Sequence, residues 1–160
     1  MAILTPRDEQ DLVDIVRRAR AAKTTLEVVG RGTRRRLGRP VAATDTVDLS
    51  GLTGITLYEP SELVLTARVG TPLSEIVTTL AGSNQELAFE PVDHSALLGH
   101  AAGSGSIGGI IGVGTAGSRR LKIGSARDHL LGFRGVNGFG DAFKSGGRVM
   151  KNVTGFDLSK

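Results

Sequence analysis

The chain has 160 residues, a length that suits one domain with a substantial core. Its formal net charge of +4 is too small to imply nucleic-acid binding by itself. It contains no cysteine, which excludes disulfides, thiolate catalysis and cysteine-ligated metal centres within this chain. Because no apolar run reaches the roughly eighteen residues of a membrane span, and none follows a basic start, we expect neither a span nor a secretion signal.

The first predicted element is a helix that begins after Thr5 and Pro6. A hydroxyl cap, a proline in the first turn and acids directly after it favour a helix start, and apolar residues at helical spacing continue to Ala19. Strands are predicted at residues 26–29 and 46–49, on either side of an arginine-rich loop. These elements predict a small βαβ-like lobe over residues 1–51.

The rest of the chain, residues 52–160, is predicted to form a larger α+β lobe. Its helix begins with Thr71 as the cap, carries Val77 on its apolar face, and ends at Gly82 or Asn84. A turn at Asn137 favours a hairpin between the last two strands. The predicted strands are residues 55–58, 63–69, 130–136 and 141–143. Because Leu158 and its neighbour Phe156 are core-type residues, we expect the lobe to be cut short at Lys160.

Glycine is concentrated in residues 103–117, where seven of fifteen positions are glycine. The run contains G-x-G-x-x-G, and Asp128 lies twenty positions beyond it, as in a dinucleotide-binding Rossmann turn. We predict against that fold, because no convincing strand precedes the run and each interior glycine destabilises a crossover helix by about 1 kcal/mol.

A short helical turn over residues 107–111, capped by Ser106, is predicted instead. Its first N–H groups are expected to be unpaired, and glycines on both sides would let an anion approach the backbone. The alternative, that these glycines only permit close packing, stays open.

A second glycine loop, V-G-R-G-T-R-R-R-L-G-R over residues 29–39, combines glycines with a hydroxyl and five arginines. Successive N–H groups in such a turn can form an anion-binding nest, and arginine pairs well with phosphate. A solvated basic loop and an RNA-binding patch are the alternatives, although one tyrosine and no tryptophan leave little for stacking bases. Two glycine loops in one small domain favour the diphosphate linker of an extended dinucleotide.

The order of the motifs resembles a known family. G-R-G-T-R at residues 30–34 is followed by S-I-G-G at 106–109, then by Arg127-Asp128, then by K-N-V-T-G-F-D at 151–157. This order resembles the N-terminal FAD-binding domain of the vanillyl-alcohol oxidase / p-cresol methylhydroxylase type, and among its members the flavin subunits of glycolate oxidases. The resemblance covers essentially the whole chain, and it implies a two-lobed α+β FAD-binding domain that is incomplete at its C-terminus.

By this resemblance, FAD lies extended between the lobes, with its pyrophosphate on residues 30–34 and its isoalloxazine near residues 115–117. Residues 124–128 would line the adjacent wall, and residues 151–157 would form a structural corner. Since the first loop has no histidine, the FAD is expected to be noncovalent. The implied cofactor-binding residues are Gly30, Arg31, Gly32, Thr33, Arg34, Gly105, Ser106, Ile107, Gly108, Gly109, Thr115, Ala116, Gly117, Gly124, Ser125, Arg127 and Asp128.

The family also implies a function: an FAD-dependent oxidoreductase that oxidises a small 2-hydroxy acid. The partners it implies are a second flavin subunit and an iron–sulfur subunit, in the cytoplasm or peripheral at the inner membrane through those partners. No nucleic-acid partner is implied. A cofactor-free structural or assembly module of the same fold is the alternative.

No catalytic residue is assigned from the sequence. His129 and its neighbour Asp128 are expected to be structural, with Asp128 capping a turn or pairing with Arg127. The basic residues that could place positive charge near flavin or substrate are Arg119, Arg120 and Lys122, although a solvated loop is the simpler interpretation. The other two histidines, His94 and His100, lie in an irregular loop, and no pair has helical metal-ligand spacing, so no metal is predicted.

Overall fold

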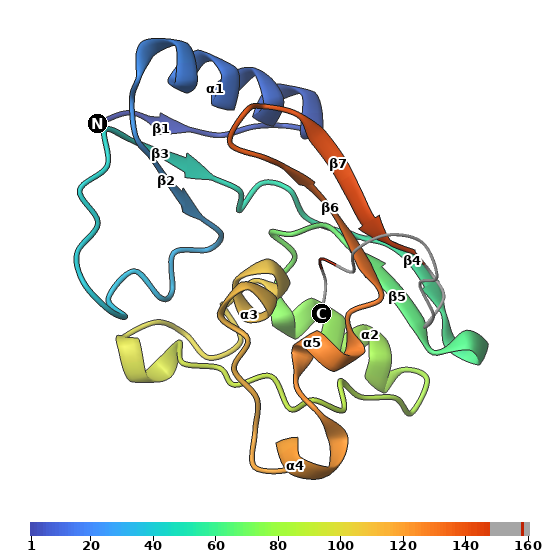
Figure 1. Ribbon diagram of the computed structural model, residues 1–160. Coiled ribbons are helices and arrows are strands. Elements are labelled where there is room, and N and C mark those ends of the chain that lie inside the picture. The colour runs from blue at the N-terminus through green and yellow to red at the C-terminus, as the bar shows by residue number, and fades with distance from the viewer. Residues whose placement is uncertain (148–157, 159–160) are drawn as a thin grey trace.

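A computed structural model describes residues 1–147 and Leu158 of the chain (Figure 1). The predicted corner motif at residues 151–157 lies outside the described residues, and Leu158 is 63% exposed rather than buried. The elements in chain order are β1 (Ile3–Leu4), α1 (Glu9–Ala22), β2 (Leu26–Val29), β3 (Asp45–Asp48), β4 (Ile55–Glu59), η1 (Pro60–Glu62), β5 (Val64–Ala67), α2 (Leu73–Ala81), η2 (Ala96–Leu98), α3 (Ile107–Val113), α4 (Arg120–Ile123), α5 (Ala126–His129), β6 (Gly132–Val136) and β7 (Ala142–Gly146).

The N-terminal part is a three-stranded parallel sheet in the order β1-β3-β2, with α1 connecting β1 to β2 (Figure 1). Val13, Ile15 and Ala19 of α1 are buried, and Val47 in the central strand is wholly buried. The helix thus joins two strands that lie parallel on either side of β3. The two-residue strand β1 was not predicted, because it is too short to show alternation.

The predicted start of α1 is wrong by three residues. Asp8, in an extended conformation, is the N-cap, and its carboxylate accepts a hydrogen bond from the N–H of Asp11 at 2.8 Å. A carboxylate caps as well as a hydroxyl and also favours the positive end of the helix dipole. Thr5 and Pro6 therefore belong to the connection between β1 and the helix.

Two antiparallel hairpins follow, β4–β5 and β6–β7. The turn of the second is the predicted one: the side-chain oxygen of Asn137 accepts hydrogen bonds from two loop N–H groups, and Gly140 takes a positive φ. This hairpin runs along α1 (Figure 1), where Arg134 makes a bidentate pair with Glu9 at 2.6 and 2.8 Å. The Arg20 guanidinium also stacks over Phe139, 4.7 Å from the ring centroid.

The helix α2 buries Leu73, Ile76 and Leu80, whereas Val77, predicted on that face, is 49% exposed. Thr71 was predicted as its cap, but the N-cap is Pro72, which offers no side-chain hydrogen bond. The second core cluster forms where α2, α3 and α5 meet, and it consists of Leu73, Phe89, Ile110 and Ala126.

Thr71 instead closes the loop between β5 and α2. Its hydroxyl is fully buried, accepts the N–H of Gly54 at 3.0 Å, and donates to the carbonyl of Arg68 at 2.7 Å. Thr71→Val is expected to destabilise the fold by about 1–3 kcal/mol, because the Gly54 N–H loses its buried partner. Chemical denaturation measures the loss, and Thr71→Ser, which keeps the hydroxyl, is the control; equal losses in both variants would contradict the assigned hydrogen bond.

Candidate functional site

The two glycine loops predicted from the sequence lie directly against each other. A Cβ atom on Gly30 would collide with the Ser106 hydroxyl, one on Gly109 would lie 3.3 Å from an Arg34 nitrogen, and one on Gly105 would lie 3.6 Å from the Thr33 hydroxyl. A side chain at Gly30 would push the loops apart and one at Gly109 would crowd Arg34, whereas a Cβ at Gly105 would make an ordinary contact. The glycines therefore allow two segments more than seventy residues apart to share one junction.

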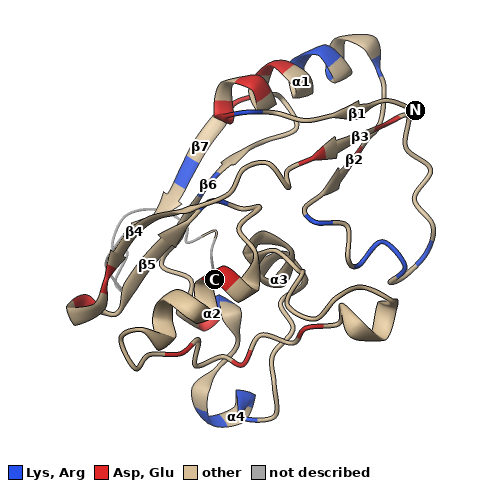
Figure 2. Ribbon diagram, turned by 180° about the vertical axis from the view of Figure 1, so that it is seen from behind, with Lys and Arg blue, Asp and Glu red and all other residues tan. Residues whose placement is uncertain are grey.

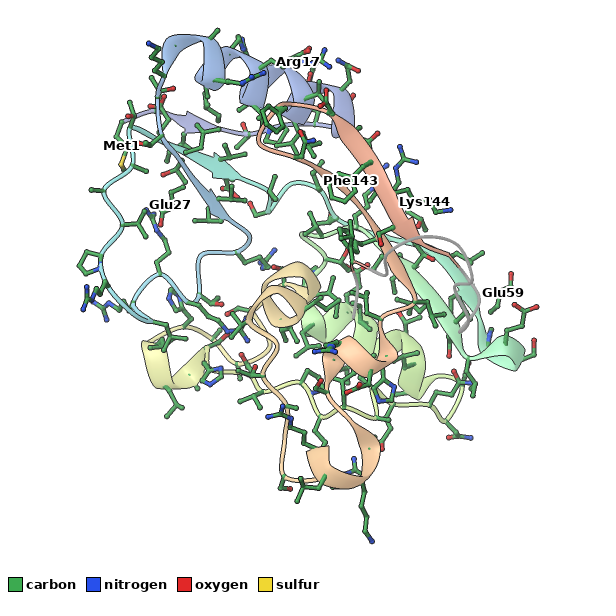
Figure 3. The ribbon with its side chains drawn as sticks, in the orientation of Figure 1. Met1, Arg17, Glu27, Glu59, Phe143 and Lys144 are labelled. Carbon is green, nitrogen blue, oxygen red and sulfur yellow. The ribbon has the colours of Figure 1, made fainter. Side chains whose placement is uncertain are left out.

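Arginine side chains reinforce this junction. The Arg31 Nε donates to the carbonyl of Ser104 at 2.7 Å, and the Arg34 Nη2 donates to the carbonyl of Val92 at 2.9 Å. Arg35 points back to Glu27, labelled in Figure 3, which extends from β2 and accepts its Nε at 3.1 Å. The basic stretch is visible after β2 in Figure 2. Three of its five arginines have hydrogen-bond partners within the protein.

The backbone of the first loop is open to an anion. Within the part of the chain that the structure describes, the N–H groups of residues 31–34 donate no hydrogen bond. Gly32 has φ +68°, a conformation that favours glycine and lets successive N–H groups point to one side. Thr33 is buried, and Arg34 is half-buried beside it. An open backbone with a left-handed glycine is what the predicted nest requires, and the nest itself stays a prediction.

In the second loop, in contrast, the N–H groups of residues 107–109 are already hydrogen-bonded. Ser106 caps α3 as predicted, and its hydroxyl accepts the N–H of Gly109 at 3.3 Å. The N–H of Ile107 donates to the carbonyl of Thr71 at 2.9 Å, and that of Gly108 donates to Val69 at 3.0 Å. The expectation that these N–H groups are unpaired is therefore wrong, because the approach to α2 supplies carbonyl partners for them.

The same region excludes a Rossmann turn. Among the described residues, no strand lies between β5 and β6, so none leads into the glycine run. The helix α3 has only seven residues and ends where Gly114 takes a left-handed conformation, φ +66°. The G-x-G-x-x-G spacing therefore has no dinucleotide-binding role of the Rossmann kind here, as predicted.

Residues 115–117 follow α3 on the chain. The Thr115 hydroxyl is buried without a hydrogen-bond partner among the described residues. Gly117 packs against Glu90, whose Cβ lies 2.6 Å from the position that a Gly117 Cβ would take. Arg119, a candidate for positive charge near the flavin, pairs with Glu90 at 2.7 Å and with Glu86 at 3.3 Å. Its charge is therefore already balanced inside the protein.

Residues 124–128 run from the C-cap of α4 through the N-cap of α5 into that short helix. Ser125 and Asp128 form a capping box, in which the Asp128 carboxylate accepts the Ser125 N–H at 2.7 Å and its hydroxyl at 3.0 Å. These two hydrogen bonds lower the pKa of Asp128. Arg127 is exposed. The expectation that Asp128 caps a turn is confirmed, and no proton-abstracting geometry is present in this box.

A pH-dependent stability follows from this box. Because the folded state lowers the Asp128 pKa, the stabilisation is complete above the ordinary aspartate pKa of about 3.9 and is lost as pH falls through the lowered value. Asp128→Asn is expected to melt at a lower temperature than wild type at pH 7, and the gap should narrow below about pH 4. Thermal melts across pH measure it, and a gap that stays constant throughout would contradict the assignment.

The histidines have structural surroundings. The Nε2 of His129 lies 2.9 Å from the carbonyl of Ile123, and its ring packs against Phe89 with centroids 5.7 Å apart. His100 is exposed, and the Nδ1 of His94 is buried without a partner among the described residues. No cluster of three potential metal ligands occurs in the described part of the chain, and no helix there is long and apolar enough to cross a membrane.

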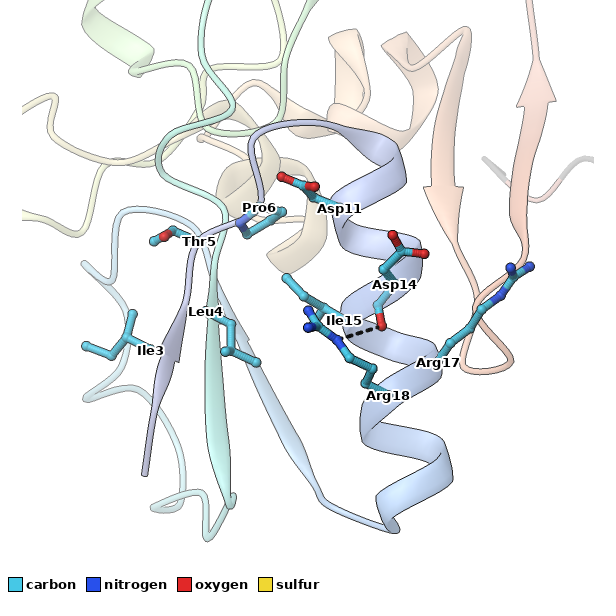
Figure 4. Close-up of a pocket in the computed structure, with 9 residues that line it drawn as sticks. All are labelled: Ile3, Leu4, Thr5, Pro6, Asp11, Asp14, Ile15, Arg17 and Arg18. Carbon is cyan, nitrogen blue, oxygen red and sulfur yellow. Dashed lines mark hydrogen bonds between the residues drawn. The ribbon is translucent and has the colours of Figure 1, made fainter.

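A hollow of about 640 Å³ lies elsewhere, between β1 and α1 (Figure 4). Its lining mixes apolar residues with Asp11, Asp14, Arg17 and Arg18, and it shares no residue with either glycine loop. The Arg18 Nε donates to the backbone carbonyl of Asp14 there, so part of its polar surface is used locally. We assign the hollow no role in the candidate site.

The junction of the loops fits an anionic, hydroxyl-rich ligand. Besides the open N–H groups of residues 31–34, several buried polar atoms, some of them in or beside the loops, have no hydrogen-bond partner among the described residues. These atoms are Arg34 Nε, Ser95 Oγ, Ser104 Oγ, Thr115 Oγ1 and His94 Nδ1. Buried polar groups in folded proteins are nearly always paired with protein, water or a ligand. Buried polar atoms without partners, together with a glycine nest, are therefore what a polar cofactor site would show.

Sequence reasoning missed the acids that organise this region. Glu90 holds Arg119, and the carboxylate of Asp93 accepts the N–H groups of Ser95 at 2.9 Å and Gly103 at 2.6 Å. The Asp-x-Ser pattern, in which an aspartate accepts the N–H two residues on, is a visible signal of the second feature. Nothing in the sequence marks Glu90, because its partners lie 27 to 29 residues away.

Comparison with known proteins shows which family the chain belongs to. A family described as FAD binding domain matches residues 1–146. The glycolate oxidase subunit GlcE of Escherichia coli is 42% identical over 151 residues, which are 94% of this chain and 41% of that protein. D-2-hydroxyglutarate dehydrogenase of Xanthomonas citri pv. viticola is 31% identical over 99% of this chain and 32% of its own length. The chain thus spans well under half of these relatives.

Solved structures share the fold at low sequence identity. 6-Hydroxy-D-nicotine oxidase from Arthrobacter nicotinovorans has a TM-score of 0.71 at 18% identity, covering 90% of this chain and 29% of that one. Alkyldihydroxyacetonephosphate synthase has a TM-score of 0.72 at 18% identity, covering 98% of this chain and 27% of that one. With the family match over residues 1–146, the chain belongs to the FAD-binding domains of the vanillyl-alcohol oxidase / p-cresol methylhydroxylase type, and its cofactor is FAD.

Proposed function

We propose that FAD lies noncovalently across the junction of the two glycine loops, with its diphosphate against residues 30–34. The observation that carries this proposal is the row of unpaired N–H groups in that loop, beside the half-buried guanidinium of Arg34. Both kinds of donor favour a phosphate oxygen. The division of the chain into lobes at residue 51 stays a prediction.

The other cofactor residues are proposed to act in two ways. Residues 105–109 support the first loop by close packing, since their own N–H groups are mostly used. Residues 115–117 and 124–128 are proposed to line the isoalloxazine end, where the buried Thr115 hydroxyl offers a free donor and acceptor. FAD supplies the hydride-accepting chemistry, and the described residues bind it and exclude water.

For the complete protein, we propose a flavin-dependent oxidoreductase acting on a small 2-hydroxy acid. The two relatives are named for glycolate and D-2-hydroxyglutarate, which share a hydroxyl next to a carboxylate. The word subunit in the first name supports assembly with a second flavin subunit. An iron–sulfur subunit, and a cytoplasmic position peripheral to the inner membrane, are further parts of the proposal.

The test uses the complete protein. It should purify with visible flavin absorbance, release intact FAD on acid denaturation, and lose that absorbance anaerobically when glycolate, D-lactate or D-2-hydroxyglutarate is added. Protein that lacks flavin and fails to take up added FAD would instead support the cofactor-free assembly module. Bound flavin that none of these acids reduces would contradict the substrate class alone.

A further inference from the structure

Four residues between α2 and η2, Glu90 to Asp93, contact three of the segments assigned to the cofactor: the first glycine loop, the approach to the second, and residues 115–117. They begin directly after Phe89, whose ring is 6% exposed in the core cluster with Leu73, Ile110 and Ala126. The segment is therefore anchored at one end in this close-packed cluster.

The first contact is with residues 115–119. The Glu90 carboxylate accepts the backbone N–H of Arg119 at 2.9 Å and its Nε at 2.7 Å. Gly117 packs so tightly against the Glu90 side chain that a Cβ would lie 2.6 Å from the Glu90 Cβ. Glu90 thus holds Arg119 by hydrogen bonds and Gly117 by close packing.

Glu90 also has an unusual backbone. Its φ of +51° lies in the left-handed region, which residues other than glycine seldom adopt. Such a conformation persists where the surroundings over-determine it, and these positions cluster at functional sites. Here Phe89 on one side and Arg119 on the other fix the residue.

The second and third contacts come from the end of the segment. The carbonyl of Val92 accepts Arg34 from the first glycine loop at 2.9 Å. The Asp93 carboxylate binds the N–H groups of Ser95 and Gly103, which closes the loop that leads into the second glycine loop. Burial raises the pKa of Asp93, but these hydrogen bonds and the nearby Arg34 lower it further, so the group is ionised at neutral pH.

We infer that the segment Glu90–Asp93 sets the relative position of the three cofactor-binding loops, and that Glu90 is the positioning residue that fixes residues 115–117 against the flavin ring. This inference rests on the proposed function. Glu90 acts through Arg119 and Gly117, and it need not touch the cofactor itself.

A simpler role for Glu90 would be to neutralise Arg119. Glu86 provides the matched comparison, because it contacts the same guanidinium at 3.3 Å. Its side chain is 72% exposed, whereas that of Glu90 is 30% exposed. Only Glu90 also accepts the Arg119 N–H and packs on Gly117. Charge neutralisation and positioning therefore make different predictions for the two acids.

The experiment measures FAD affinity and the visible circular dichroism of bound flavin at saturating FAD, in the complete protein. Glu90→Ala is expected to weaken FAD binding about tenfold and to change the flavin spectrum. Glu90→Gln, whose amide oxygen can still accept the Arg119 N–H, should restore the wild-type spectrum, and Glu86→Gln should match wild type in both measurements.

Two results would overturn the inference: Glu90→Ala with wild-type affinity and spectrum, or Glu86→Gln with the same defect as Glu90→Ala. If Glu90→Ala fails to fold, Gly117→Ala tests the same contact and should change the same spectrum; a wild-type spectrum there would also overturn it. If the wild-type protein itself binds no FAD, the proposed function is wrong, and this result is distinguishable because it needs no variant.

Discussion

Gly32→Asp is expected to yield complete protein that purifies without flavin. The substitution puts a carboxylate on the loop whose N–H groups are proposed to bind the diphosphate, at a residue with φ +68°. Juxtaposed like charges cost several kcal/mol, so FAD affinity should fall by on the order of a hundredfold or more. The ratio of flavin to protein after purification, and an FAD titration of the apoprotein, measure the effect.

Gly38→Asp is the control for this substitution. Gly38 has φ +84°, and no atom lies within 4 Å of the position that its Cβ would take. The variant therefore adds the same charge and the same kind of backbone strain six residues further on, outside residues 30–34. It should retain FAD. Retention of flavin by both variants would show that the diphosphate does not lie on this loop, and loss by both would point to charge or strain in general.

Gly108→Ala is expected to destabilise the protein by about 3 kcal/mol, at the upper end for overpacking, and to lower its flavin content. An alanine Cβ would collide with the Val69 side chain and lie 2.8 Å from the Val69 carbonyl oxygen. The same carbonyl accepts the Gly108 N–H at 3.0 Å, so relief of the clash would break a hydrogen bond that holds the second loop. Thermal melts and flavin content report the two effects.

Gly112→Ala is the matched variant within the same helix. Nothing lies within 4 Å of the position of its Cβ, so the substitution should stabilise α3 by about 0.4–1 kcal/mol through the unfolded state. A Gly108→Ala variant as stable as Gly112→Ala would show that the second loop does not depend on close approach to Val69.

The sequence allowed the overall fold to be predicted wherever a signal was local. Three elements occur as expected because neighbouring residues determine them. They are α1 with its apolar spacing, the first hairpin with its β-rich stretches, and the turn at Asn137. Boundaries were missed where two capping residues competed, as with Thr5 and Asp8, or where a strand has only two residues.

The candidate site was harder to predict because its hydrogen bonds are not local. The N–H groups after Ser106 were expected to be free, yet carbonyls of Val69 and Thr71, some forty residues earlier, accept two of them. Arg119 was a candidate for placing positive charge near flavin or substrate, but its guanidinium pairs with Glu90, which the sequence did not indicate. The glycine and arginine content of a segment indicates that it could approach a phosphate. Only the tertiary contacts decide which of its N–H donors are still free to bind one.

The contact between Arg31 and Ser104 joins residues 73 positions apart, and that between Glu9 and Arg134 joins residues 125 apart. Closing loops of this size costs chain entropy, which must be overcome before such contacts contribute any stabilisation. During synthesis, the arginine loop emerges well before the segment it needs. The proposed flavin site therefore needs both segments, so FAD can bind there only after the chain has been synthesised beyond Ser104 and folded back onto the arginine loop.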